Sequence, residues 1–507
     1  MTDPSGPTAG SMARRALVLR SPLVVDGCFA AFCVLVATSR YLALTAPSVL
    51  PGIDGGNWLA LGHAWLGGSG PGTTYPPLVP VLTVVAVSLF GPIHGVAGLA
   101  ALSSVAPAAG AYGVLRSQRL GWVAAMLSGF LLVGRPTGEA TAWGGYPQLL
   151  GIGVSLLALA ALDRYLASGT GRHALATGVL LALDLATSHF TGLMTVAAGV
   201  VIVLLHLLWG DRRGTRQLSW RTAWLVLAPS LVLVPVYWRL VPALVQEVPG
   251  PGPALGTTAS IGASGAFAFI GVAAVLATPL VLWRRQRSRS LWRLTTSVVV
   301  VTAVAYGVTR EPRLLYFGPI GAILAAALWI QDLGHRTADW LRGAAVVASL
   351  ILTVALGVQT VNSFRLFHAQ RDFYSIAPEG MLAATDWLRG STSPHAVLAV
   401  APVGGAPLGW WVEGLTRRPT DAGSDSVWLA YPQERARARI ADSIFTGSFP
   451  DDATIATAMR LGVDYLVLPT TWNGYDAGVV HAFERAHPST VKFDDGSVVV
   501  LSTGVRP

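Results

Sequence analysis

The side chains that could do chemistry lie in four short polar segments of an otherwise apolar chain. They are Asp54, Trp58 and Tyr75 in the first segment, Glu139, Trp143 and Tyr146 in the second, Asp184 and His189 in the third, and Arg310, Glu311 and Arg313 in the fourth. Ionisable groups beside long apolar runs are costly in lipid and usually mark a functional site. Carboxylates accept protons and arginines bind anions, so we predict one site that combines both kinds of group.

The composition indicates an integral membrane protein. Of the 507 residues, 52% are apolar and 12% are charged, and apolar runs of membrane-spanning length recur between residues 22 and 359. The net charge of +9 is almost entirely due to arginine, because Lys492 is the only lysine. These arginines lie mostly in short loops, a pattern that sets membrane orientation and argues against nucleic-acid binding. Cys28 and Cys33 both fall in the first apolar run, which argues against a zinc site or a disulfide framework.

Eleven apolar segments are predicted to span the membrane. They are residues 23–44, 95–115, 121–133, 149–165, 174–186, 193–209, 222–241, 263–283, 295–308, 314–330 and 343–359. If the tail at residues 1–20 is cytosolic, the inner loops carry most of the arginines, in agreement with the positive-inside rule. We therefore predict an all-α polytopic bundle in residues 21–360, with a long first outer loop at residues 45–94.

One apolar run, residues 78–89, does not fit this count. It has only about a dozen residues before Gly91 and Pro92, and a full span here would reverse the charge bias of every later loop. We interpret it as a juxtamembrane helix on the outer side of the membrane.

After about Val361 the pattern becomes that of a soluble α/β domain. Helices are predicted at residues 378–389, 433–445 and 453–461, strands at 396–401 and 465–468, and a hairpin at 491–501 around Asp494, Asp495 and Gly496. Eleven spans from a cytosolic start place this domain, residues 361–507, on the extracytoplasmic side.

Several motifs together resemble those of a known enzyme family. A long first outer loop with an acidic residue is followed by TyrProProLeu at residues 75–78, a second loop reads GluAlaThrAlaTrpGlyGlyTyrProGln at 139–148, and a late loop reads ArgGluProArg at 310–313. TrpTrpValGluGly at 410–414 and ArgArgProThr at 417–420 lie in the last domain. This layout resembles the GT-C glycosyltransferases, polyprenyl-phosphate-sugar-dependent membrane enzymes that include the protein mannosyltransferases and the aminoarabinose transferase. The second loop lacks the AspXAsp pair of that family, since Glu139 stands alone.

The resemblance implies roles for the residues of the four segments. Asp54 would act as the catalytic base, and Glu139 would assist it or bind a divalent cation such as Mg²⁺ or Mn²⁺. Arg310 and Arg313 would bind the lipid phosphate. Trp58, Trp143 and Tyr146 would stack on the sugar, and we place Tyr75, Asp184, His189 and Glu311 in the same substrate-binding region. The implied partners are a polyprenyl-phosphate sugar, membrane lipids and a glycan, lipid or protein acceptor at the plasma membrane.

Structural explanations remain open for these residues. Asp54 lies in AspGlyGlyAsn, which is also a turn sequence, Glu139 could pair with Arg135, and Arg310 and Arg313 could be interfacial anchors. His189 could be an ordinary helix-end histidine. A polytopic transporter, or a non-catalytic protein that binds a lipid-linked glycan, is the alternative function, although no repeat of the kind seen in transporters is evident.

Overall fold

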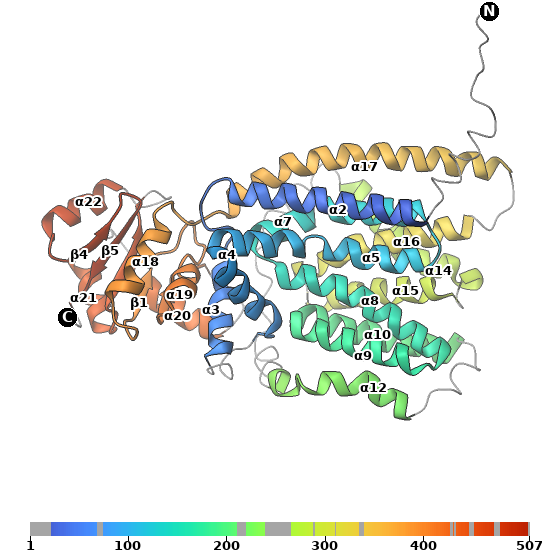
Figure 1. Cartoon of the computed structure of the whole chain (residues 1–507), viewed down its shortest axis with the longest axis horizontal. Helices are drawn as coiled ribbons and strands as arrows, with labels where there is room; N and C mark the ends of the chain where they lie inside the picture. Colours follow the sequence, from blue (N-terminus) through green and yellow to red (C-terminus); the bar gives the residue numbers. More distant parts are fainter. Residues whose placement is uncertain are drawn as a thin grey trace, which may run out of the picture.

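The computed structural model describes residues 22–67, 75–209, 220–238, 265–286, 289–309, 311–333, 339–425, 429, 432–445, 451–470 and 477–504. Most of these residues are helical. Figure 1 shows the majority of the helices side by side along the long axis of the molecule, with the strands gathered at one end.

Among the described residues, five helical stretches are long and apolar enough to cross a membrane. They are α2 (Pro22–Thr45), the consecutive pair α4 (Leu78–Ser103) and α5 (Ala106–Ser117), α8 (Tyr146–Ser168), α10 (His189–Trp209) and α15 (Ser290–Thr309). The other helices of the bundle are α6 (Trp122–Leu132), α9 (Gly171–Thr187), α12 (Trp220–Leu231), α14 (Gly265–Gln286), α16 (Gly318–Leu333) and α17 (Asp339–Tyr374). Each of the eleven predicted segments overlaps at least one of these helices. The boundaries differ, since residues 95–115 cover the end of α4 as well as α5, and residues 222–241 extend beyond the end of α12. The chain is therefore a mainly helical, multi-pass membrane protein, as predicted, and the number of helices that cross the bilayer stays a prediction.

Small residues allow the central helices of the bundle to approach closely. Helix α8 packs against α5, α9 and α10. At the α5–α8 crossing, a Cβ on Gly110 would lie 2.4 Å from the carbonyl oxygen of Gly153, and a Cβ on Gly153 would lie 2.3 Å from that of Ala106. Apolar burial gives little driving force between helices in lipid, so such close packing is a main source of their association.

The kink in α4 agrees with the predicted end of the short juxtamembrane helix. Gly91 has a φ of 78°, which interrupts the helix immediately before Pro92. The two halves fold onto each other, because a Cβ on Gly95 would lie 2.5 Å from the carbonyl oxygen of Ala86. Glycine supplies the backbone conformation for this break without steric cost, and proline begins the next helical segment. The first half also packs against α3 (Gly55–Leu66), which lies in the first predicted outer loop.

A buried ion pair joins three helices of the bundle. Arg293 at the start of α15 donates hydrogen bonds of 2.6 and 3.1 Å to the two carboxylate oxygens of Asp163 near the end of α8. His206, near the end of α10, lies 3.2 Å from the same carboxylate. All three side chains are buried. A charge in this position is stable only with its partner, so the pair fixes the relative position of these helices.

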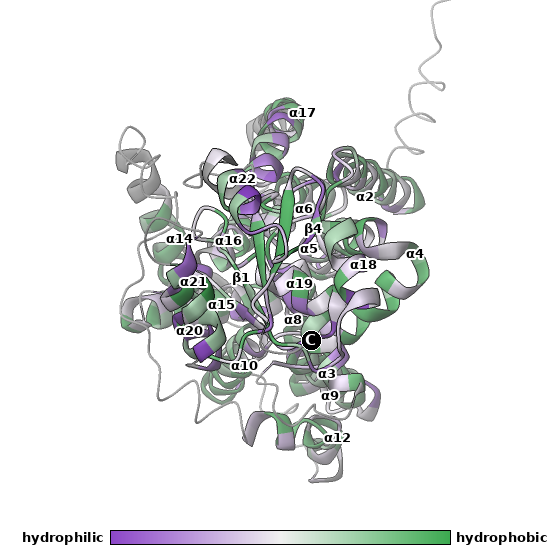
Figure 2. Ribbon diagram, turned by 90° about the vertical axis from the view of Figure 1, so that its left-hand side faces the viewer, coloured by the Kyte–Doolittle hydropathy of each residue, from purple (hydrophilic) through white to green (hydrophobic). Residues whose placement is uncertain are grey.

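The C-terminal part contains a five-stranded mixed sheet of strand order β2-β1-β3-β5-β4. Its strands are β1 (Leu398–Val400), β2 (Thr420–Ala422), β3 (Tyr465–Pro469), β4 (Val491–Asp494) and β5 (Val498–Ser502), and its helices are α18 (Met381–Ser391), α19 (Gly409–Thr416), α20 (Pro432–Ile444), α21 (Asp452–Arg460) and α22 (Ala477–Ala486). Strands β1, β2 and β3 are parallel, and β5 pairs antiparallel with β3 and β4. The view along the bundle shows hydrophobic residues in these strands (Figure 2).

The strands in the centre of the sheet are buried, and the predicted hairpin is present as β4 and β5. The side chains of β1 and β5 are almost entirely buried, as expected for strands covered on both faces. Helix α17 passes through the predicted domain boundary at residue 361 without interruption and ends at Tyr374. The last helix of the bundle therefore extends beyond the predicted boundary, and α18 lies between it and the first strand.

Candidate active site

The first and second predicted outer loops meet at the backbone of Asp54. The N–H groups of Ile53 and Asp54 both donate hydrogen bonds to the carbonyl oxygen of Trp143, at 3.1 and 3.0 Å. Gly52 precedes them with a φ of 72°, and a Cβ there would lie 2.7 Å from the carbonyl oxygen of Ala142. Only glycine fits this close approach of two backbones. Asp54 then forms the N-terminal cap position of α3, with its side chain half-buried.

The TrpGlyGlyTyr motif of the second loop provides the other half of this junction. It follows α7 (Arg135–Trp143), whose end at Gly144 has a φ of 112°. A Cβ on Gly144 would lie 2.7 Å from the Cβ of Asp54, and the Gly144 carbonyl accepts a 2.7 Å hydrogen bond from the indole N–H of Trp58. The motif therefore packs against the backbone and the Cβ of Asp54. Trp58 and Tyr146 are both buried, whereas Trp143 is only partly buried.

Three aromatic side chains connect the first loop to the start of α10. The ring of Tyr75 lies 4.7 Å from that of Trp58 and 5.0 Å from that of His189, centroid to centroid. Tyr75 also shares a hydrogen bond with Ser188, the residue before His189. Burial raises the pKa of the Tyr75 phenol, so this group stays neutral at physiological pH. The sequence-predicted residues Trp58, Tyr75 and His189 thus lie in one cluster.

Arg313, which comes much later in the sequence, lies beside Phe190, the neighbour of His189 in this cluster. It lies in a 3₁₀ helix, η2 (Pro312–Phe317), and its Nε donates a 2.7 Å hydrogen bond to Glu311. Its guanidinium lies 5.4 Å from the centroid of the Phe190 ring, next to His189. The charge of Arg313 acts on Asp54, on Tyr75 and on His189. Arg313 therefore lies near enough to these three residues for an electrostatic effect, and Arg310 lies outside the described residues.

The electrostatic environment of Asp54 favours its neutral form. Burial raises the pKa of Asp54 well above its ordinary value, and the carboxylate of Glu434 raises it further, whereas Arg313 opposes both effects. Glu434 lies on α20 of the C-terminal part, so a residue of that part acts on this carboxylate. A carboxyl group whose pKa is raised in this way is a stronger base when it is ionised.

Glu139 has a different set of neighbours. Its carboxylate accepts a 3.1 Å hydrogen bond from the phenol of Tyr374 at the end of α17, and it acts on Tyr316. Tyr316 in turn lies 3.3 Å from the indole nitrogen of Trp143. Among the contacts of the described residues, none joins Glu139 directly to Asp54. Glu139 is therefore linked to Trp143 through Tyr316, whereas Asp54 is linked to Trp143 through its backbone N–H.

Asp184 lies in a buried polar cluster inside the bundle. Its two carboxylate oxygens accept hydrogen bonds from Thr191 at 2.8 Å and from Thr195 at 2.5 Å, and Thr195 also contacts Ser155 of α8. The side chain is completely buried. Within the part of the chain that the structure describes, no contact joins Asp184 to Asp54 or Arg313, so its predicted substrate role stays a prediction without a direct contact to support it.

The donor atoms around Asp54 provide a limited basis for a divalent cation. Within the described ranges, three potential ligands come together at one place, His481, Glu484 and Asp494, which lie on α22 and β4 far from Asp54 in the sequence. Mg²⁺ usually takes one or two carboxylates and completes its shell with water and substrate phosphate. Asp54 could provide one carboxylate ligand to such an ion, but no contact among the described residues joins Glu139 to Asp54. We therefore derive no step through a metal.

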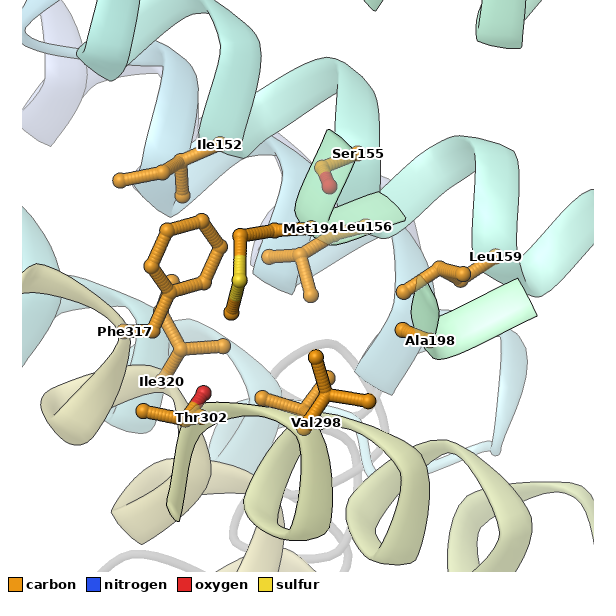
Figure 3. Close-up of a pocket in the computed structure, with 11 residues that line it drawn as sticks. Ile152, Ser155, Leu156, Leu159, Met194, Ala198, Val298, Thr302, Phe317 and Ile320 are labelled. Atoms are coloured by element: carbon orange, nitrogen blue, oxygen red, sulfur yellow. The ribbon is translucent and has the colours of Figure 1, made fainter. Parts of the chain in front are cut away.

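An apolar pocket lies inside the helical bundle. Its cavity volume is about 10 Å³, close to the space that one water molecule needs, and its wall is formed by α8, α10, α15, η2 and α16. Figure 3 shows Ile152, Met194, Phe317 and Ile320 turned toward this space, with the hydroxyl groups of Ser155 and Thr302 at its edge. A second small pocket, of about 40 Å³, shares Ile152 and Ile320 and is bordered by Tyr316. Apolar space thus begins beside the 3₁₀ helix that carries Arg313.

The C-terminal part also contributes to the site, and the sequence did not reveal this. The indole N–H of Trp411 in α19 donates a 3.0 Å hydrogen bond to the carbonyl oxygen of Gly52, 359 positions earlier in the chain. The TrpTrpValGluGly motif was predicted only as a feature of the last domain. Its glycine and tryptophan residues were a signal of close packing, but their partner could not be identified without the structure.

Comparison with known proteins identifies the fold. No protein-family model matches the sequence, and no curated protein matches it either. Among solved structures, ArnT from Cupriavidus metallidurans in the apo state aligns with 95% of this chain and 99% of its own, at 15% identity and a TM-score of 0.56. The fold is that of the GT-C glycosyltransferases.

Two further GT-C structures show the same likeness. ArnT from Cupriavidus metallidurans bound to undecaprenyl phosphate aligns with 94% of this chain and 98% of its own, at 14% identity and a TM-score of 0.53. The arabinofuranosyltransferase AftD from Mycobacteria aligns with 94% of this chain at 14% identity and a TM-score of 0.55, but only 40% of AftD is covered. At such identities the likeness shows the GT-C fold only. The reaction of this chain must be argued from its own residues.

Proposed function

We propose that this protein is a GT-C glycosyltransferase that moves a sugar from a polyprenyl-phosphate donor to a hydroxyl group of a glycan, lipid or protein acceptor. The observation that carries the proposal is the convergence of Asp54 and Arg313, from opposite halves of the chain, around Tyr75 and His189. A base and a fixed cation at one end of a GT-C fold are the two groups that this transfer needs.

The proposed reaction is a displacement at the anomeric carbon of the donor sugar. The acceptor oxygen forms the new bond to this carbon while the bond from the carbon to the phosphate oxygen breaks. The acceptor proton goes to the carboxylate of Asp54, and the electron pair of the broken bond leaves with the lipid phosphate. Arg313 stabilises the negative charge that grows on this phosphate in the transition state.

The environment of each group supports its proposed role. The raised pKa of Asp54 makes it a stronger base than an exposed carboxylate. The carboxylate of Glu311 accepts two hydrogen bonds from Arg313, one from the Nε of the guanidinium and one from the backbone N–H. The printed description of one ArnT structure, bound to undecaprenyl phosphate, is consistent with a polyprenyl-phosphate donor.

We propose that the transfer takes place on the extracytoplasmic side of the plasma membrane, where the C-terminal part would also lie. The arginine distribution of the loops supports this orientation. A lipid-linked donor suits that side because nucleotide sugars are confined to the cytosol, and no Gly-rich phosphate loop is evident in the sequence.

The test is a transfer assay on purified protein with a panel of polyprenyl-phosphate sugars, comparing wild type with Asp54→Asn. We expect transfer from at least one donor, and a loss of about 10²-fold or more in the variant, the usual contribution of a positioned general base. Asp386→Asn is the control, because this exposed carboxylate only pairs with Arg389 on α18. Transfer by Asp54→Asn at the wild-type rate would remove Asp54 from the mechanism.

A further inference from the structure

Helix α19 of the C-terminal part packs directly on α3, the helix that begins immediately after Asp54. A Cβ on Gly56 would lie 2.4 Å from the backbone nitrogen of Trp411, and a Cβ on Gly414 would lie 2.7 Å from the carbonyl oxygen of Gly56. The two helices therefore touch backbone to backbone. Such contact leaves no room for water or for an independent movement of one helix across the other.

The side chain of Trp411 lies against the turn that carries Asp54. Its indole ring is fully buried, and a Cβ on Gly55 would lie 2.6 Å from the ring. Its N–H donates a 3.0 Å hydrogen bond to the carbonyl oxygen of Gly52. The indole thus contacts the residue two positions before Asp54 and the residue directly after it.

The same turn is held on its other side by the second outer loop. The carbonyl oxygen of Trp143 accepts the N–H groups of Ile53 and Asp54, and the backbone of Gly52 lies against that of Ala142. The turn is therefore enclosed between the membrane part of the chain and Trp411. Without the indole N–H, the buried carbonyl of Gly52 would lose its hydrogen bond and the turn would be fixed on one side only.

We propose that Trp411 is a positioning residue for Asp54, so that the C-terminal domain forms one wall of the catalytic site. This inference rests on the proposed function and assigns a further residue to it. A carboxylate that must reach the acceptor hydroxyl loses rate when its position is loosened by even a fraction of an ångström. Donor binding depends on Arg313, on a different element, and should be preserved.

The experiment compares Trp411→Phe with Trp410→Phe in the full-length protein. Both changes remove the same atoms from neighbouring buried positions of α19, but within the described residues only the indole of Trp411 has a hydrogen bond to the first loop. We expect Trp411→Phe to lower kcat about tenfold, the effect of one well-placed hydrogen bond. Its KM for the lipid-phosphate donor should stay within about twofold, and Trp410→Phe should leave both parameters near wild type.

A second variant keeps the proposal testable if Trp411→Phe fails to fold. Gly56→Ala would push α19 away from α3 while leaving the indole intact, and Gly390→Ala, whose added Cβ meets no atom within 4 Å, is its control. We expect the same loss of kcat with unchanged donor KM for Gly56→Ala only. Equal loss of kcat in each variant and its control, or no loss in any, would overturn the positioning role.

Hydrogen exchange separates this inference from the proposed function. In Trp411→Phe, we expect the amides of Ile53 and Asp54 to exchange about tenfold faster than in Trp410→Phe, whether or not a donor sugar is transferred. Wild-type protein that transfers no sugar from any donor contradicts the proposed function alone. Unchanged exchange of both amides in Trp411→Phe would contradict the role of Trp411, even in an active enzyme.

Discussion

The backbone N–H of Asp54 donates a hydrogen bond to the carbonyl oxygen of Trp143 at 3.0 Å. Through this bond the first outer loop lies on the second, and Gly52 and Gly144 provide the space for it. The position of the candidate base is therefore determined by backbone contacts on rigid elements, which is the arrangement that a precise catalytic group requires. The following predictions concern the charges and contacts around it.

Removal of the cationic group should weaken donor binding. Arg313→Ala eliminates the proposed charge-assisted contact with the lipid phosphate, a contact of about 1.5–3 kcal/mol, so we expect the donor Kd to rise roughly 10- to 100-fold. Binding of a polyprenyl phosphate to purified protein measures this effect. Arg389→Ala, which removes an exposed arginine of α18, is the control. An unchanged Kd in Arg313→Ala would exclude Arg313 from the phosphate site.

The acid limb of the pH profile, where transfer is lost at low pH, should shift in opposite directions in two variants. A base must be ionised, so activity is present above the raised pKa of Asp54 and is lost as the pH falls through it. Glu434→Gln removes a negative charge, lowers the pKa of Asp54 and moves the acid limb to lower pH. Arg313→Gln removes a positive charge, raises this pKa and moves the limb to higher pH.

The measurement for this pair is the pH profile of kcat/KM, which reports on the free enzyme. Tyr75 and Tyr146 also interact with Asp54, but ordinary phenols are neutral in the acid range. The pH at which the acid limb falls should therefore depend on the burial of Asp54 and on the charges of Glu434 and Arg313. A shift of both variants in the same direction would refute the assignment of this limb to Asp54.

Loss of one partner of the buried ion pair should destabilise the bundle more than loss of both. Asp163→Asn leaves the guanidinium of Arg293 buried without its counter-ion, at a cost of about 3–5 kcal/mol. The double variant Asp163→Leu with Arg293→Met removes both charges and should be the more stable of the two. Thermal unfolding in detergent compares them, and a double variant that unfolds at the lower temperature would be the contrary result.

Accessible cysteines should report the orientation of the chain. In a Cys28→Ala/Cys33→Ala background, we expect an impermeant thiol reagent added to intact cells to label Ser391→Cys, which is exposed at the end of α18. Ser117→Cys, exposed at the end of α5, should react only after the membrane is opened. The reverse pattern would place the C-terminal domain in the cytosol.

The helices of the bundle could be predicted from the sequence because a chain in lipid must satisfy its backbone hydrogen bonds within each segment. Apolar length therefore located segments that overlap the helices of the bundle, and Gly91 with Pro92 indicated the break in α4. The number of segments that cross the bilayer stays a prediction. The short helix α7 and the three-residue strand β2 could not be foreseen, since neither is long enough to show a period.

The candidate site could be predicted in its residues but not in its contacts. Asp54, Tyr75, His189 and Arg313 stand out by their polarity beside apolar runs, and the charge of Arg313 acts on the other three, while their shared role in a site stays a prediction. The partner of Glu139 could not be identified, because Tyr374 lies at the far end of α17 and has no local signal. The same reason applies to Glu434 and Trp411, whose effect on the first loop depends on the docking of a separate part of the chain.

Helix α17 extends without interruption from Asp339 to Tyr374. At 1.5 Å per residue, its 36 residues make a rod of roughly 54 Å, well beyond the thickness of the hydrocarbon layer. A helix of this length is long enough to cross that layer and extend beyond it, and its last residue, Tyr374, donates a hydrogen bond to the carboxylate of Glu139. Helix α17 therefore links the helical bundle directly to the second predicted outer loop.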